Sequence, residues 1–275
     1  WQRRLFNMEV SMSKVYLKTY FYVEHEIKFL IMNLIESYDH IDMFIICEHN
    51  RTHTGQPRDF IFEKYKDRFP EELMDKVLYL PCDISEHTVE AYDNEDAIHA
   101  VNEPVMRSAF MTNIDFDDED IILSVDADEI IYKESYDYIL SEVDKKDCVR
   151  LNLHQFFYKP TYLWKDIDFV SPIATKYKVF HGQYPCNLRD VGDVVSEKVG
   201  CHFSWCMTPD EMVYKLHTYS HPQYRFCADK KLLENAIENK EYPFDESVDF
   251  QIEELYIGDD RLPKSLYTYG KEYAL

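Results

Sequence analysis

Residues 14–47 read KVYLKTYFYVEHEIKFLIMNLIESYDHIDMFIIC, and this stretch decides the fold class. Residues 14–22 are rich in β-branched and aromatic side chains, which predicts a strand. Residues 24–38 carry apolar side chains at helical spacing and predict an amphipathic helix. Residues 41–47 form a nearly continuous apolar run, typical of a strand that is buried on both faces. Strand, helix and strand in this order predict the start of a parallel α/β sheet.

The rest of the chain continues this alternation. Further strands are predicted at residues 76–80, 120–125, 149–158 and 174–180. Further helices are predicted at residues 86–113 with an interruption at Pro104, at residues 133–143, from Thr208 onward, and at residues 229–239. We therefore expect one α/β domain over residues 1–275, with a Rossmann-like mixed sheet and helices on both faces.

The composition describes an acidic protein with enough apolar residues for a packed core. The formal net charge is −22, from 52 acidic and 30 basic residues, and 45 % of the residues are hydrophobic. Because such an acidic surface repels the phosphate backbone, we expect no nucleic-acid partner. No apolar run approaches the roughly 18–20 residues that span a bilayer, so we expect no membrane span in this chain. The seven cysteines lack the spacing of a zinc site, and mostly free, buried thiols are expected.

Two aspartates, Asp126 and Asp128, directly follow the predicted strand at residues 120–125. Ligands of open α/β sheets bind at the carboxyl ends of the strands, and residues two apart in an extended segment point to the same side. Mn²⁺ and Mg²⁺ prefer oxygen ligands and are often held by one or two carboxylates together with substrate phosphates. The pattern therefore predicts a metal–diphosphate site. The alternative without a ligand is an acidic loop or the start of a helix. Residues 115–117 supply a second D-x-D, which shows that the pattern also arises by chance in this acidic chain.

Three stretches of the chain resemble one enzyme family. They are CEHNRT at residues 47–52 with GQPR at 55–58, DADEI at 126–130, and HFSWCMTPD at 202–210. They are similar, in the same order, to the motifs C-E-x-N-x-T-x-x-G-x-P-R, D-A-D-E-I and H-C-S-W-C-F-T-P-E of glycosyltransferase family 17, the β-1,4-mannosyl-glycoprotein 4-β-N-acetylglucosaminyltransferases. Phe203 stands where that family has its second cysteine, and Asp210 where it has a glutamate.

The resemblance implies a GT-A-type fold and an inverting, metal-dependent transfer of GlcNAc from a UDP-sugar to a glycan hydroxyl. It also implies Mn²⁺ or Mg²⁺ as cofactor, and a nucleotide-sugar donor and a glycan acceptor as partners. On this basis we expect a nucleotide-sugar-binding half at about residues 14–145, an acceptor-side half at about 146–240 and a C-terminal tail at 241–275. We expect a soluble, cytoplasmic protein, or one in the Golgi lumen if an N-terminal anchor has been removed.

Two other functions remain open from the sequence. Phosphatases of the haloacid dehalogenase type also carry a D-x-D after a strand, with the first aspartate as nucleophile. Their motif lies near the start of the chain and has Thr or Val two residues after the second aspartate, where Ile130 stands here. A metal-dependent phosphatase is therefore the less favoured enzyme. The alternative without catalysis is a carbohydrate-binding protein on a transferase fold.

Further candidate donor-site residues follow the strands or lie near them. Glu48, Asn50 and Arg58 follow the predicted strand at residues 41–47, where they either bind the nucleotide or build a capped turn. Arg107 precedes the D-x-D strand and either contacts the diphosphate or forms a surface ion pair.

The third motif and the end of the second supply the remaining candidates. His202 is either a third metal ligand beside Asp126 and Asp128 or a core histidine. Trp205 either packs in the core or stacks on a sugar ring. Inversion needs a general base on the acceptor hydroxyl; Asp210 is the first candidate, because it matches an acidic residue of the family, and Glu129 is the second.

Overall fold

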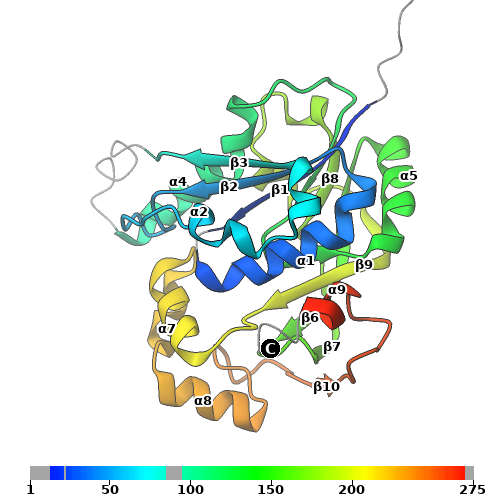
Figure 1. The fold of residues 1–275 in the computed structure, drawn as a ribbon. Coiled ribbons are helices and arrows are strands. Elements are labelled where there is room, and N and C mark those ends of the chain that lie inside the picture. The colour runs from blue at the N-terminus through cyan, green and yellow to red at the C-terminus, as the bar shows by residue number, and fades with distance from the viewer. Residues whose placement is uncertain (1–12, 22, 85–94, 270–275) are drawn as a thin grey trace, which may run out of the picture.

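The computed structural model describes residues 13–21, 23–84 and 95–269 of the chain (Figure 1). Its ten strands are β1 (Val15–Phe21), β2 (Met43–His49), β3 (Val77–Cys82), β4 (Ile121–Ser124), β5 (Glu129–Ile131), β6 (Cys148–Phe157), β7 (Tyr162–Phe169), β8 (Ile173–Lys176), β9 (Val194–Ser204) and β10 (Ile252–Glu254). The helices are α1 (Ile27–Ser37), α2 (Phe62–Tyr65), α4 (Glu95–Ser108), α5 (Tyr136–Lys146), α6 (Pro185–Leu188), α7 (Pro209–Thr218), α8 (Lys230–Asn239) and α9 (Ser265–Tyr269).

All described strands belong to one mixed sheet. The strand order is β10-β7-β6-β8-β4-β1-β2-β3, and β9 pairs with both β6 and β5 beside this path. Strands β1 to β4 are parallel to one another, whereas β8 runs antiparallel to β4 and to β6. Strands from both expected halves of the chain, and β10 from the tail, therefore share one set of backbone hydrogen bonds.

The parallel strands place the candidate residues at one edge of the sheet. Phe21 at the end of β1 pairs with Glu48 near the end of β2, and Lys18 pairs with Ser124 at the end of β4. The loop that carries Asp126 and Asp128 thus leaves the sheet close to the end of β1. This is the edge at which open α/β sheets bind their ligands.

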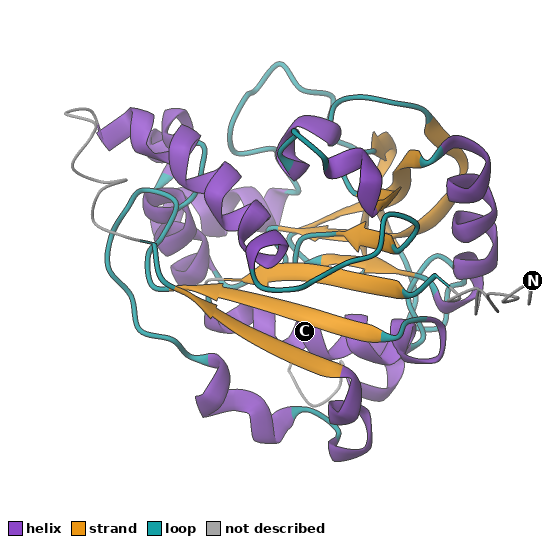
Figure 2. Cartoon of the chain, turned by 90° about the horizontal axis from the view of Figure 1, so that it is seen from above, coloured by secondary structure: helices purple, strands orange, loops and turns teal. Residues whose placement is uncertain are grey.

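Helices cover both faces of the sheet, as Figure 2 shows from above. Alternate side chains of β1 explain this, because they point to opposite faces. Leu17 and Phe21 join a core cluster with α1 and α5, whereas Tyr16 and Tyr20 join a second cluster that contains Met106 of α4. The predicted α/β class, with a mixed sheet and helices on both faces, is confirmed.

Most predicted elements are present, with shifts of a few residues at their ends. The predicted strand at residues 174–180 is wrong in its second half, because the chain turns into a 3-10 helix at Tyr177–Phe180. Helix α4 begins at Glu95 and contains Pro104, while residues 86–94 of the predicted helix lie outside the described residues. The predicted helix start at Thr208 is confirmed as a capping box, in which Thr208 Oγ1 accepts from the Glu211 backbone and the Glu211 carboxylate accepts from the Thr208 backbone.

Four of the described strands were not predicted from the sequence. They are β5, β7, β9 and β10. The third motif begins in the last residues of β9, which ends at Ser204. Across residues 13–21, 23–84 and 95–269, no helix combines the length and the apolar character needed to cross a bilayer.

Gly200 lies on β9 between β5 and β6, and we predict that Gly200→Ala destabilises the fold. A Cβ at this position would overlap the backbone oxygen of Ile130 and lie 3.0 Å from Leu153 Cδ2. We expect a loss of about 1–3 kcal/mol in the free energy of unfolding, measured by urea denaturation, because overpacking a core forces neighbours to shift. Glu197→Ala, at an exposed position of the same strand, is the control and should change stability by less than about 0.5 kcal/mol. Equal stability of both variants would contradict the packing argument.

Candidate active site

A cavity of about 620 Å³ lies beside the carboxyl ends of β1 and β4, and Asp126 and Asp128 both line it. Its charged lining residues are Glu26, Glu103, Arg107, Asp126, Asp128, Arg189, Asp190 and Lys215. A second group of lining residues is aromatic and comprises Trp205, Tyr219, His221, Tyr224, Tyr242 and Phe244. The cavity therefore joins an ionic region at the D-x-D to an aromatic region contributed by later parts of the chain.

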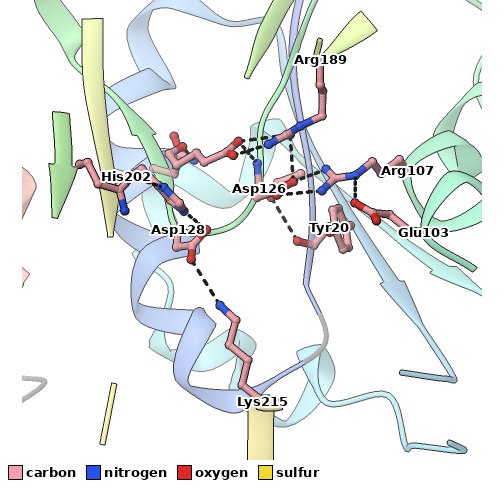
Figure 3. A network of polar contacts seen from close by, with 12 residues as sticks. Tyr20, Glu103, Arg107, Asp126, Asp128, Arg189, His202 and Lys215 are labelled. Carbon is pink, nitrogen blue, oxygen red and sulfur yellow. Dashed lines mark hydrogen bonds and ion pairs between the residues drawn. The ribbon is translucent and has the colours of Figure 1, made fainter. Parts of the chain in front are cut away.

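Asp126 is held by two arginines that reach it from α4 and from the residue after α6 (Figure 3). Arg107 binds both carboxylate oxygens, with Nη2 3.0 Å from Oδ2 and Nη1 on Oδ1. Arg189 Nη1 lies 3.2 Å from Oδ1. Burial alone would raise the pKa of Asp126, but the charges of Arg107 and Arg189 outweigh it and hold this pKa well below its usual range. The carboxylate is therefore ionised and engaged with protein groups.

Glu129 lies behind the D-x-D loop and ties it to Arg189. Its side chain is fully buried, and Oε1 accepts a 2.5 Å hydrogen bond from Arg189 Nη2. Oε2 accepts a 2.5 Å bond from the backbone N–H of Asp126. Burial raises the pKa of Glu129, and the charge of Arg189 offsets this only in part. Glu129 does not line the cavity and its carboxylate supports the loop, and its role as general base stays a prediction.

Asp128 and His202 face each other across the cavity. Asp128 Oδ1 lies 3.8 Å from His202 Nε2, and Asp128 Oδ2 lies 3.8 Å from Lys215 Nζ, both too far for a hydrogen bond. His202 Nδ1 is 2.8 Å from Gln155 Oε1, which can only accept, so the proton sits on Nδ1 and Nε2 carries the lone pair. Burial lowers the pKa of His202 to about 4, so the ring is neutral at pH 7.

This pair fits a divalent cation in part. A metal-binding histidine usually donates its other ring N–H to an oxygen, as His202 does to Gln155. Mg²⁺ and related ions are commonly held by one or two protein ligands plus substrate phosphates. No cluster of three or more His, Cys, Asp or Glu side chains arranged for a metal occurs in the described part of the chain. Of the three predicted metal ligands, Asp126 is bound by arginines, whereas Asp128 and His202 make no short contact with each other; the ligand set stays a prediction.

The structure does not bring Glu48, Asn50 and Arg58 into this cavity. Glu48 is fully buried and accepts hydrogen bonds from Arg58 at 2.7 Å, from Tyr79 at 2.8 Å and from the backbone of Ile61 and Phe62. Asn50 accepts from the Ile84 backbone at 2.9 Å. These contacts shape the loop after β2, and a nucleotide-binding role for the three residues stays a prediction.

Asp210 also lies outside the cavity that contains the D-x-D. It lines a second cavity of about 980 Å³, together with Arg58 and with Tyr214 of α7. Its side chain is 74 % exposed and pairs with Lys230 at 2.7 Å. Its role as general base stays a prediction.

Sequence reasoning missed three residues of the site, namely Gln155, Arg189 and Lys215. Lys215 lies on α7, and Gln155 lies on β6. Both elements reach the D-x-D only because β9 pairs with β5 and with β6. Arg189 follows a four-residue helix in a stretch that matches no motif. The chain shows no local pattern that marks it, because its partners Asp126 and Glu129 are 63 and 60 residues away.

We predict that Arg189→Met destabilises the protein and that adding Glu129→Gln recovers part of the loss. Removing one partner of a buried ion pair typically costs about 3–5 kcal/mol, because the other charge stays buried. The glutamine side chain of the double variant would keep an acceptor for the Asp126 backbone N–H without burying a charge.

The prediction for this pair is tested by urea unfolding of both single variants and the double variant. In Arg189→Met the folded-state pKa of Glu129 rises further above its unfolded value, so stability should fall as pH increases from 5 to 8. Losses that simply add in the double variant would show that the two residues do not interact.

Comparison with known proteins supplies the family. The family model described as Glycosyltransferase family 17 matches residues 5–240. No curated protein matches the sequence at a significant level.

Among solved structures, 4-diphosphocytidyl-2C-methyl-D-erythritol synthase is 9 % identical, with 75 % of this chain and 99 % of that chain covered and a TM-score of 0.40. Residues 1–349 of S. aureus TarS are 10 % identical, with 82 % and 74 % covered and a TM-score of 0.38. Galactosyltransferase LgtC in complex with donor and acceptor sugar analogues is 5 % identical, with 62 % and 61 % covered and a TM-score of 0.37. The TM-scores and sequence identities of these three structures are low, so the family assignment rests on the family model alone. Because that model matches most of the chain, the protein belongs to glycosyltransferase family 17 and is a glycosyltransferase.

Proposed function

We propose that the protein transfers GlcNAc from a UDP-sugar to a glycan hydroxyl with inversion, and that Mn²⁺ or Mg²⁺ is required. The observation that supports this most is the position of Asp128 Oδ1, 3.8 Å from the unprotonated Nε2 of His202 at the D-x-D and beside Lys215. The choice of uridine and of GlcNAc rests on the resemblance of the three motifs to the family.

The cations of the cavity suit a diphosphate. Lys215 Nζ contacts Asp128 only at 3.8 Å, and it lies 5.2 Å from the centroid of the Trp205 ring. Its ammonium can therefore turn towards a phosphate without breaking a short ion pair. Arg107 and Arg189 lie at the same edge, where Asp126 holds them in place. The charged lining comprises five carboxylates and three cations, so a diphosphate would find cationic partners here, and a divalent metal ion would offset negative charge that remains.

A direct displacement also asks three things of the chain. Asp128 and His202 would hold the metal ion, which offsets negative charge on the departing diphosphate. Asp126 and Glu129 keep Arg107 and Arg189 in place by the hydrogen bonds described above. A carboxylate must take the proton of the acceptor hydroxyl within hydrogen-bond reach. Besides the predicted Asp210 and Glu129, the carboxylates of Glu26, Glu103 and Asp190 line the cavity and are the next to test.

We predict that Asp128→Asn lowers metal-dependent UDP release from UDP-GlcNAc by about 100-fold or more. The substitution replaces the carboxylate of one of the two proposed metal ligands by a neutral amide. The assay compares a panel of UDP-sugars with Mn²⁺ and with EDTA. Asp115→Asn, in the exposed second D-x-D, is the matched control and should retain wild-type rates.

Turnover that EDTA leaves unchanged would contradict metal dependence. Failure of every UDP-sugar to be turned over or bound would overturn the proposed donor. Release of inorganic phosphate from simple monoesters, lost in Asp126→Asn, would favour the phosphatase instead.

A second prediction concerns Gln155, which holds the His202 ring in the tautomer that metal binding needs. Gln155→Leu removes this hydrogen bond and should raise the Mn²⁺ concentration for half-maximal UDP release by about 10- to 100-fold. The rate at saturating Mn²⁺ should change much less. A lower rate at saturation with an unchanged Mn²⁺ requirement would show that Gln155 supports the site in another way.

A further inference from the structure

The aromatic part of the cavity has no role in donor binding as described above. Its six rings form a connected group, which we call the aromatic wall: Trp205, Tyr219, His221, Tyr224, Tyr242 and Phe244. Phe244 is the hub, with ring centroids 4.8 Å from Trp205, 4.9 Å from Tyr224 and 5.3 Å from Tyr242. Trp205 and Phe244 are each only 7 % exposed, whereas His221, Tyr224 and Tyr242 are more open. The wall thus has a buried base and an accessible rim.

Trp205 is held in an unfavourable backbone conformation. Its φ angle is +57°, in the left-handed region that costs a non-glycine residue about 1–2 kcal/mol. The strain occurs immediately after β9 ends at Ser204, where the chain turns towards α7. Strained residues persist where the surrounding structure fixes them, and they are concentrated at binding sites. Here the turn places the indole in the cavity lining, beside the ammonium of Lys215.

Tyr219 contributes a polar group that no other described residue satisfies. Its side chain is buried, it lines the cavity, and its hydroxyl has no hydrogen-bond partner among the described residues. An unsatisfied buried hydroxyl costs free energy unless a ligand or water completes it.

We propose that the aromatic wall binds a pyranose ring of the acceptor glycan, with a C–H face of the sugar on the rings of Tyr224 and Tyr242. This inference rests on the proposed function. A pyranose has an apolar C–H face and a polar rim of hydroxyls, which matches a wall of apolar ring faces with phenol groups. The wall begins at Trp205, next to Lys215 of the ionic region. A sugar bound there lies beside the donor site and leaves Asp128 and His202 to the diphosphate.

The alternative occupant with a flat face is the nucleotide base, and the test separates the two. Tyr242→Ala and Tyr224→Ala remove half-buried rim rings and spare the buried base of the wall. Phe226→Ala is the matched control, because this ring is 70 % exposed in the same segment as Tyr224 but does not line the cavity. Thermal unfolding verifies that each variant is folded.

The probes are N,N′-diacetylchitobiose and mannobiose, titrated by calorimetry, with UDP titrated separately. We expect each rim variant to weaken binding of a disaccharide by about 10-fold and to leave UDP binding unchanged. Phe226→Ala should bind both like the wild type. Weaker UDP binding in the rim variants, or disaccharide binding that no rim variant changes, would overturn the proposal.

Hydrolysis of UDP-GlcNAc without acceptor keeps the two hypotheses apart. Hydrolysis that persists in the rim variants, together with weaker disaccharide binding, supports both the donor and the wall. Disaccharide binding that depends on the rim in a protein that turns over no UDP-sugar would retain the wall and overturn the proposed function. Normal donor hydrolysis with no disaccharide binding by the wild type would overturn the wall alone.

Discussion

The site depends on a buried ionic network in which Arg189 bridges two carboxylates and Arg107 holds one of them. Arg189 bonds to both Asp126 and Glu129, and Arg107 holds Asp126 from the other side. Burying one such charge without partners would be prohibitive, so each member requires the others. The network joins α4, the loop after β4, β5 and the segment after α6. It thereby fixes the direction of the D-x-D loop and leaves Asp128, the second aspartate, open to the cavity.

A further cation lies beneath this network. Lys18 on β1 is completely buried, its Nζ has no hydrogen-bond partner among the described residues, and burial lowers its pKa to about 8. Its ammonium lies 5.2 Å from the ring centroid of Tyr20 and 5.5 Å from that of Phe110. The faces of these two aromatic rings therefore stabilise the charge by cation–π interactions. The positive charge of Lys18 also favours the ionised form of Asp126. The central strand therefore contributes to the electrostatics of the site as well as to the sheet.

The parallel half of the fold was predictable because its signals are local. Apolar runs at residues 41–47 and 120–125 and the helical spacing after residue 24 each predict an element without knowledge of its neighbours. The D-x-D could be located for the same reason, since a buried strand leads directly into it. His202 could be proposed only through the resemblance in its motif, and its partner Gln155 was not found. Strands β5 and β9 were missed because β5 has three residues and β9 mixes exposed charges with buried apolar residues.

Helix α7 lies between the two cavities described above. Lys215 and Tyr219, the residue after the helix, line the cavity of the D-x-D, whereas Glu211 and Tyr214 line the other. The helix is held at its start by the capping box of Thr208 and Glu211, and near its end by a hydrogen bond from the Thr54 backbone to the Thr218 carbonyl. Because one helix forms part of both walls, a displacement of α7 would change the lining of both cavities at once.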